Sequence, residues 1–261
     1  MAQKEFFYPS SDGINLIHAM IWFPDRDTFQ RPKGIVQISH GMVEYVGRYD
    51  EFARYLNARG YLVAGNDHLG HGESVQSRED WGYFAAQDGD VCVIKDLHRL
   101  TYMLKKRYPA IPFFLLGHSM GSFIARRCFL AFGRELDGMI LLGTGNHHRG
   151  LLYAGLMLTR LLKLCKGERY KSPLLRKLMF GSYNRRIKNP ASANDWVCSD
   201  ETVMTAYNKD PACTFLFTVN GVEVLMKNLL FISNRNNMVN VPKDIPILMA
   251  SGKEDPVGNY G

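Results

Sequence analysis

Short apolar runs alternate with amphipathic segments along most of this chain. Four of the runs are compact and apolar enough to predict buried strands. They lie at 34–39, 61–65, 113–116 and 138–142. Apolar residues recur at helical spacing at about 49–59, at 91–107 and after residue 121. Strands that alternate with helices predict an α/β fold with a mostly parallel sheet, whose ligand site lies at the carboxyl ends of the strands.

Turn residues define the N-terminal part of this pattern. The polar turn at 10–13 separates two strand-like runs, so the chain is expected to open with an antiparallel hairpin. The first predicted helix has Phe52, Tyr55 and Leu56 on one apolar face and ends at Gly60, a residue type favoured at helix C-termini.

The regular alternation stops at Gly145, and about a hundred residues of helix-like, basic and polar sequence precede the next clear strand at 245–250. An insertion of that size, after the strand that follows the helix behind Ser119, predicts a cap over the site. The expected organisation is therefore an α/β core over 1–145, a helical cap over 146–240, and a continuation of the core over 241–261.

Composition places the 261-residue chain among soluble globular proteins, with 46% hydrophobic and 22% charged residues. No signal peptide or run of transmembrane length is expected from the sequence. The five cysteines are odd in number and contain no CxxC pair, which argues against a disulfide framework or a zinc site. A cytoplasmic location follows as the expectation, with peripheral membrane contact left open.

The net charge of +7 is concentrated in one segment. Residues 146–240 hold 14 Lys and Arg against 6 Asp and Glu, whereas the rest of the chain has 18 against 19. A whole-chain argument for nucleic-acid binding therefore fails, and the basic segment lacks the usual nucleic-acid motifs. No nucleic-acid partner is expected.

The strongest chemical signal follows the strand at 113–116. Residues 117–121 match Gly-x-Ser-x-Gly, in which a strand turns at once into a helix and carries the serine on strained backbone. The pattern alone is weak, since an ordinary Gly/Ser loop also fits it. A buried strand before it and an apolar helix after it indicate a nucleophile elbow at Ser119.

A nucleophilic serine also needs oxyanion donors, an acid and a base. The backbone N–H groups of Met120, next to the serine, and of Met42, next to Gly41, are the predicted oxyanion donors. Gly41 is expected to lie against the substrate. Asp255 follows a strand late in the chain and is the predicted triad acid, although a turn aspartate before Pro256 is the simpler alternative.

These motifs resemble the monoacylglycerol lipase, lysophospholipase and serine aminopeptidase-like branch of the α/β hydrolases. The resemblance runs from about Ile14 to the last residue and rests on four blocks in order. They are His40-Gly41-Met42-Val43-Glu44 with Gly47-Arg48-Tyr49, Asp67-x-x-Gly70-His71-Gly72-x-Ser74, residues 117–121, and Gly252-x-x-Asp255-Pro256-Val257. The resemblance implies the α/β-hydrolase fold, ester hydrolysis through an acyl-enzyme, no cofactor or metal, and a lid over a lipid-accepting tunnel. Tyr45-Val46 departs from the His-Ser common in monoacylglycerol lipases, which leaves the alcohol half of the substrate open.

The triad histidine of that family follows the aspartate, beyond one more helix and a final strand. None of the eight histidines before Gly261 occupies that place. His118 should point away from Ser119, and His147 and His148 are the only outside candidates for the base. The expectation is therefore a C-terminally incomplete hydrolase with its histidine beyond Gly261, and with a final helix, strand and helix missing.

The predicted cap is basic, with 11 Lys and Arg and one acid over 149–188. Apolar residues at 151–165 with basic flanks suit an interfacial helix on an anionic membrane, whereas a packed cap helix with a solvated basic face is the alternative. Leu156, Met157 and Leu158 are candidates for an acyl-chain entrance.

The sequence thus favours a serine hydrolase that cleaves lipid esters, either monoacylglycerol or lysophospholipid. A peptidase or short-chain esterase on the same fold is one alternative. A non-catalytic hydrolase-like binding protein, suggested by the absent histidine, is the other. Acyl length, head group and oligomeric state stay open.

Overall fold

A single mixed sheet forms the centre of the computed structural model, which describes residues 2–25, 28, 30–239 and 241–260. The sheet order among these residues is β1-β2-β4-β3-β5-β6-β7. The strands are β1 Gln3–Pro9, β2 Leu16–Trp22, β3 Gly34–Ser39, β4 Tyr61–Asn66, β5 Phe113–His118, β6 Gly138–Leu142 and β7 Ile247–Ala250. β1 and β2 form the expected antiparallel hairpin, and β2 also pairs antiparallel with β4. From β4 to β7 every neighbouring pair is parallel.

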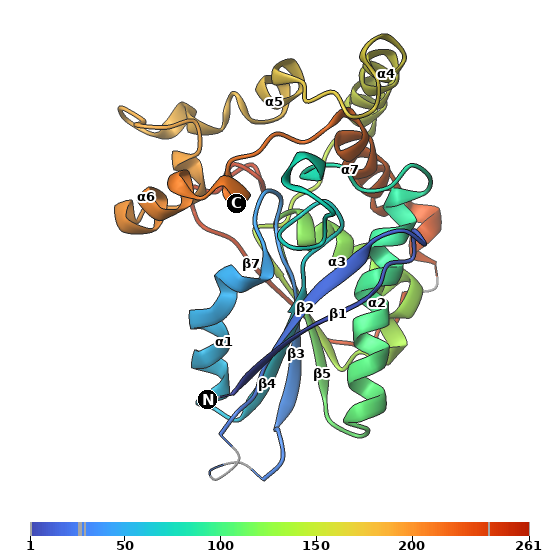
Figure 1. Ribbon diagram of the computed structural model, residues 1–261, viewed down its shortest axis with the longest axis vertical. Helices are drawn as coiled ribbons and strands as arrows, with labels where there is room; N and C mark the ends of the chain where they lie inside the picture. Colours follow the sequence, from blue (N-terminus) through green and yellow to red (C-terminus); the bar gives the residue numbers. More distant parts are fainter. Residues whose placement is uncertain (1, 26–27, 29, 240, 261) are drawn as a thin grey trace.

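Helices cover both faces of the sheet (Figure 1). They are α1 Asp50–Asn57 on one face, and α2 Gly89–Arg107 and α3 Met120–Phe132 on the other. α7 Val219–Ile232 packs on α2, α3 and α4 Arg149–Lys166. Alternate residues of β3 serve the two faces: Ile35 belongs to the core under α2, α3 and α7, whereas Val36 and Ile38 belong to the core under α1. The sequence prediction of an α/β fold with a mostly parallel sheet is confirmed.

The predicted apolar face of α1 is wrong for Phe52 and Tyr55, whereas Leu56 is partly buried and packs against the core. Phe52 and Tyr55 are 38% and 55% exposed, while Ala53 and Asn57 are buried. The small side chain of Ala53 lets the helix approach the sheet, and the Asn57 amide donates to the carbonyl oxygens of Trp22 and Tyr61. Close fit and these two hydrogen bonds, rather than side-chain size, fix which face of the helix is inward.

The segment expected to form the cap lies beyond the carboxyl ends of the strands (Figure 1). It contains α4 Arg149–Lys166, α5 Pro173–Phe180, α6 Glu201–Lys209 and several short 3₁₀ turns. α7 follows in the same segment, but Val222, Leu225 and Leu229 place it in the main core. The predicted domain limits stay a prediction.

Strand β7 is the outer strand of the sheet among the described residues. Its apolar side chains Ile247, Leu248 and Met249 are 41%, 60% and 67% exposed. The predicted strand at 245–250 is thus present, two residues shorter at its start. None of the helices in the described part of the chain combines the length and the apolar character needed to cross a bilayer.

Candidate active site

Ser119 sits where β5 ends and α3 begins, with φ 50° and ψ −121°. This left-handed backbone is unfavourable for a residue with a side chain, and such outliers persist only where the surroundings enforce them. The Ser119 N–H donates to the carbonyl oxygen of Leu142 on the neighbouring strand β6, at 2.9 Å. The strand, sharp turn and helix have the arrangement that the sequence pattern predicts.

The two glycines that flank this turn are required by close backbone contacts. A Cβ atom on Gly117 would lie 2.6 Å from the carbonyl oxygen of Gly121. A Cβ atom on Gly121 would lie 2.0 Å from the carbonyl oxygen of Ser39 and 2.4 Å from that of His40. Because all three neighbours are backbone atoms, the packing leaves no space for a larger residue. The elbow is therefore fixed by main-chain packing inside the core.

The loop that follows β3 faces Ser119. A Cβ atom on Gly41 would lie 3.3 Å from the Ser119 Cβ, so the two backbones approach closely. Met42 comes next in this loop and Met120 opens α3, where the first helical N–H groups lack intrahelical partners. Within the described residues neither N–H donates to a protein acceptor outside regular structure. Their oxyanion role, and the substrate contact of Gly41, stay predictions.

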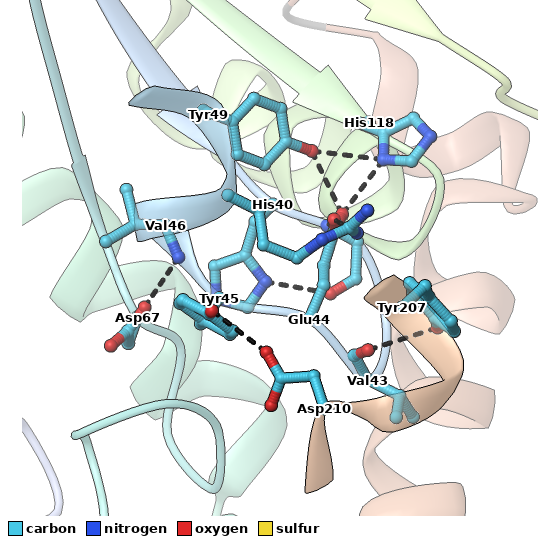
Figure 2. A network of polar contacts seen from close by, with 12 residues as sticks. His40, Val43, Glu44, Tyr45, Val46, Tyr49, Asp67, His118, Tyr207 and Asp210 are labelled. Atoms are coloured by element: carbon cyan, nitrogen blue, oxygen red, sulfur yellow. Dashed lines mark hydrogen bonds and ion pairs between the residues drawn. The ribbon is translucent and has the colours of Figure 1, made fainter. Parts of the chain in front are cut away.

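Glu44 joins this loop to the elbow (Figure 2). Its carboxylate is 4% exposed and accepts from the Gly41 N–H, the Arg48 guanidinium at 2.7 Å and the Tyr49 hydroxyl at 2.9 Å. It also lies 2.9 Å from His118 Nδ1. Burial alone would raise the pKa of Glu44, but the hydrogen bond and charge of His118 outweigh it and hold the pKa well below its ordinary value. Glu44 is thus an anion that links the Gly41 loop to the residue beside Ser119.

His118 is turned towards Glu44, in keeping with the expectation that it points away from the nucleophile. Burial would lower the pKa of His118, but the Glu44 hydrogen bond and charge raise it above its usual value. The sequence places Glu44 within the His40-Gly41-Met42-Val43-Glu44 block but does not assign it a role. A glutamate in a loop after a buried strand was the available signal, although the partner 74 residues away was not visible from it.

Asp255 follows β7 at the same edge of the sheet. Its Oδ2 accepts from the Ser251 hydroxyl at 3.0 Å, and its Oδ1 accepts from the Val257 N–H at 2.9 Å. A Cβ atom on Gly143, at the end of β6, would lie 3.1 Å from Oδ2 and 4.0 Å from His118 Nε2. The carboxylate is therefore held in a fixed orientation near the elbow. Its triad role stays a prediction.

His40, His68 and His71 lie beneath the loops, where they are buried and make structural contacts. The His68 N–H donates to His40 Nε2 at 2.9 Å, and the His71 ring contacts the rings of Phe84 and Phe217 edge-on. Burial lowers the pKa of His71 to about 3 and lowers those of His40 and His68 as well. These residues are therefore neutral and inaccessible to substrate.

No described side chain forms a hydrogen bond with the Ser119 hydroxyl, so the structure shows no base in place there. His147 lies beside Phe123, and burial lowers its pKa. His148 precedes α4 as its N-terminal cap residue. The expectation of a base beyond Gly261 is untested. No group of three or more histidine, cysteine or acidic residues in the described chain is arranged to hold a metal ion.

The residues predicted at the acyl entrance lie on α4 rather than at the elbow. Leu156 is buried, whereas Met157 is 71% exposed. Beside the elbow an apolar crevice is present instead, too narrow to admit a water molecule. Its lining consists of Phe84, Met120, Phe123, Ile124, Val224, Leu225 and Asn228. The contacts of Leu156 and Met157 with substrate stay a prediction.

Comparisons with known proteins show which family this chain resembles. A family model described as serine aminopeptidase, S33, matches residues 30–261. A monoglyceride lipase of Rattus norvegicus is 40% identical over 111 residues, which are 42% of this chain and 35% of the lipase. A monoacylglycerol lipase of Mycolicibacterium smegmatis is 31% identical over 153 residues, 57% of this chain and 50% of that lipase. These matches thus span between a third and a half of the relatives' length.

Among solved structures, a thermostable carboxyl esterase from Bacillus coagulans in complex with glycerol superposes with a TM-score of 0.89. It is 30% identical and the match covers 100% of this chain and 83% of that chain. A soluble variant of monoglyceride lipase from Saccharomyces cerevisiae has a TM-score of 0.74 at 19% identity, which bears on the fold alone.

Proposed function

The chain belongs to the serine aminopeptidase, S33, family of α/β hydrolases, and from this premise we propose that it hydrolyses carboxylic esters of lipids through an acyl-enzyme. The substrate class is monoacylglycerol or lysophospholipid. The observation that supports this most directly is Ser119, held at φ 50° at the carboxyl edge of a parallel sheet with the Gly41 loop against it. Both features belong to a nucleophile elbow and its oxyanion loop.

In the proposed reaction the Ser119 hydroxyl attacks the ester carbonyl while a base takes its proton. A tetrahedral intermediate forms, and the N–H groups of Met42 and Met120 stabilise its oxyanion. Collapse breaks the ester C–O bond, and the alcohol leaves with the proton from the base. Water then hydrolyses the acyl-enzyme by the same steps and releases the fatty acid.

Asp255 is the proposed acid that orients the base. Its two oxygens already accept hydrogen bonds from Ser251 and Val257, which fix the plane of the carboxylate. Preorganised groups of this kind cost little reorganisation during the reaction. The base itself is proposed to be a histidine.

A lipid acyl chain fits the apolar surroundings of the elbow. Met120, Phe123 and Ile124 turn apolar side chains to the narrow crevice beside Ser119. An acyl chain could enter only if these side chains or the cap shift, because the crevice does not admit even water. The similarity to a monoglyceride lipase and to a carboxyl esterase favours an ester over a peptide as substrate.

The outer face of α4 is the proposed site of peripheral contact with an anionic membrane. Tyr153, Met157, Leu161 and Leu164 are 49%, 71%, 57% and 85% exposed and recur at helical spacing. Arg160 lies within this stripe. Apolar side chains with basic neighbours suit the interface of an anionic bilayer.

Two substitutions test the proposed chemistry in the natural protein. Ser119→Ala should leave the fold intact and abolish ester hydrolysis and labelling by a fluorophosphonate probe. Asp255→Asn should also fold, but turnover should fall by about 10⁴-fold, as in a well-studied triad. Wild-type turnover by Ser119→Ala, with an unchanged circular dichroism spectrum, would refute the nucleophile. A loss below tenfold in Asp255→Asn would point to a different acid.

Substitutions on α4 test the membrane contact separately. Replacing Met157, Leu161 and Leu164 by serine should reduce co-sedimentation with phosphatidylserine vesicles, because less apolar area enters the interface. Phe52→Ser with Tyr55→Ser on α1 is the matched control, since these side chains are exposed on the opposite part of the molecule. Equal binding by both variants would favour the solvated cap face.

A further inference from the structure

The loop opposite Ser119 contains a second strained residue, Val43. Its φ is 56°, a left-handed value that is a genuine outlier for a β-branched side chain. Val43 lies between Met42, whose N–H is the proposed oxyanion donor, and Glu44, which holds the loop to the core. Strained backbone persists only where the surrounding structure enforces it. The question is therefore which group holds Val43 in this conformation.

A tyrosine from the cap contacts the strained peptide directly. The Tyr207 hydroxyl, on α6, donates to the carbonyl oxygen of Val43 at 3.2 Å (Figure 2). Tyr207 is 8% exposed and packs with Met204 and Cys213 inside the cap. Burial, followed by the nearby charge of Glu44, raises the pKa of Tyr207, so the hydroxyl keeps the proton that it donates.

A second hydrogen bond joins the loop to the cap, and here the donor is on the loop. The Tyr45 hydroxyl donates to Asp210 Oδ2 at 2.9 Å, just after the end of α6, and the Tyr45 ring packs against the same cap cluster (Figure 2). The Arg48 guanidinium lies 4.8 Å from the centre of the Tyr207 ring. Tyr45 is the residue at which this chain departs from the motif of monoacylglycerol lipases, and the structure gives it this contact.

From these contacts we infer that Tyr207 and Tyr45 are positioning residues, through which the cap helix α6 holds the oxyanion loop in its strained, donor-presenting conformation. The inference rests on the proposed function, because it assigns the Met42 N–H to the oxyanion. Movement of α6 away from the core would break both hydroxyl bonds. Val43 would then relax, and its peptide would turn the adjoining loop away from Ser119.

The core also contacts this loop. The side chains of Met42 and Val43 pack against the main core, but among the described residues only Tyr207 donates a hydrogen bond to the Val43 carbonyl oxygen. The Glu44 carboxylate accepts the Gly41 N–H, and Asp67 Oδ1 accepts the Val46 N–H at 2.7 Å. These bonds fix the loop before and after the Met42–Val43 segment. Tyr207 contacts the segment itself. Cap position and donor position are therefore coupled at one peptide group.

The coupling predicts a larger effect on kcat than on KM, because an oxyanion donor stabilises the transition state more than the bound substrate. Removing one such donor in a well-studied protease costs about 10²–10³-fold in kcat. Loosening the loop should cost less, so Tyr207→Phe should lower kcat by about 10- to 50-fold with KM changed less than threefold. Tyr170→Phe is the matched control, since this exposed cap tyrosine has no hydroxyl hydrogen bond to any other described residue.

A rescue separates this role from simple packing. Glycine adopts positive φ without the penalty that valine pays. Val43→Gly in the Tyr207→Phe background should therefore recover at least a third of the lost kcat. If Tyr207 only supports the fold of the cap, the glycine gives no recovery. That result, or a normal kcat in Tyr207→Phe, would overturn the inference.

Hydrogen exchange gives a measurement that does not depend on turnover. In the natural protein the amides of 42–46 should exchange at least fivefold faster in Tyr207→Phe than in Tyr170→Phe, while those of 117–121 stay unchanged. Should Tyr207→Phe fail to fold, Tyr45→Phe tests the same segment through the Asp210 tie. Equal exchange in 42–46 would overturn the coupling even if Ser119 proves to be the nucleophile. Faster exchange with an active Ser119→Ala would instead refute the proposed function alone.

Discussion

Two strained residues lie on the two sides of the candidate active site, and they are held in different ways. Ser119 at φ 50° is enclosed by main-chain atoms, since Gly117 and Gly121 pack against the backbone of α3 and the end of β3. Val43 at φ 56° is held by side-chain groups, one of which comes from the cap. Both residues are strained locally, but the main-chain packing around Ser119 is more rigid than the side-chain contacts that hold Val43.

The difference indicates which part of the site can respond to the cap. Close main-chain packing in a core cannot relax without large rearrangement. A hydroxyl hydrogen bond contributes only about 1 kcal/mol and can be exchanged for water. Ser119, the proposed nucleophile, is therefore expected to keep its position in every state of the cap. The loop at 41–46, which carries the proposed oxyanion donor, is the part that we infer cap movement can change.

The largest predicted effect comes from breaking the main-chain packing. Gly121→Ala would place a Cβ atom 2.0 Å from the Ser39 carbonyl oxygen, so β3 and α3 must separate. We expect the free energy of unfolding to fall by about 3 kcal/mol or more, the upper range for overpacking. Urea unfolding followed by circular dichroism measures it.

Gly252→Ala is the control for that experiment, because the nearest atom would be 3.8 Å from its Cβ. It should change stability by less than about 0.5 kcal/mol. Similar losses in both variants would mean that the elbow is not fixed by packing.

A smaller effect is expected from Glu44→Gln, which keeps the shape of the side chain but removes its charge. The charge-assisted hydrogen bonds from Arg48 and His118 would be weakened, which should lower the free energy of unfolding by about 2 kcal/mol. The pKa of His118 should also fall, because burial would then act without the carboxylate. An NMR titration of the His118 ring measures this. A His118 pKa that stays above its ordinary value would show that another group supplies the charge.

Gly41, in the loop after β3, allows a direct comparison with Gly121. A Cβ atom on Gly41 would lie 2.6 Å from Glu44 Oε1 and 3.1 Å from His118 Nδ1, both of them side-chain atoms. Side chains can shift, so Gly41→Ala should cost about 1–2 kcal/mol, less than Gly121→Ala. Parallel urea titrations compare the two. An equal or larger loss of unfolding free energy in Gly41→Ala would contradict the claim that the Gly41 loop is less rigidly packed than the turn at Ser119.

The smallest predicted change, when taken over one pH unit, is the loss of stability in acid that comes from His71. Burial lowers the pKa of His71 to about 3, from an ordinary 6.5, so the unfolded chain binds a proton that the folded chain does not. Stability from this residue is complete above pH 6.5 and is lost as the pH falls from 6.5 towards 3, by about 1.4 kcal/mol per unit. His40 and His68 act in the same direction, whereas the raised pKa of His118 acts in the opposite one.

His71→Phe isolates that contribution, since Phe84, Phe215 and Phe217 already surround the ring. The variant should lose about 1 kcal/mol less than the parent between pH 6.5 and 5.5, because the full slope is reached only below the unfolded pKa. Urea midpoints at the two pH values give the difference. Identical slopes would show that His71 is protonated in the folded protein.

Much of this architecture was predictable from the sequence because its signals are local. The strand at 34–39, the strand at 138–142 and the elbow at Ser119 depend on runs of apolar residues and on glycines within five positions of one another. Hydrophobic period and steric limits act over such short distances. They determined the fold class, the order of the elements and the location of the candidate nucleophile.

Tertiary packing alone decided how these parts are joined. Glu44 meets His118 across 74 residues, and Tyr207 meets Val43 across 164. The inward face of α1 and the exposure of β7 likewise depend on which surfaces approach each other. A local pattern records how apolar a segment is, but not which partner covers it. Hydrogen bonds between distant segments form only after the core has placed their donors and acceptors within 3 Å or so.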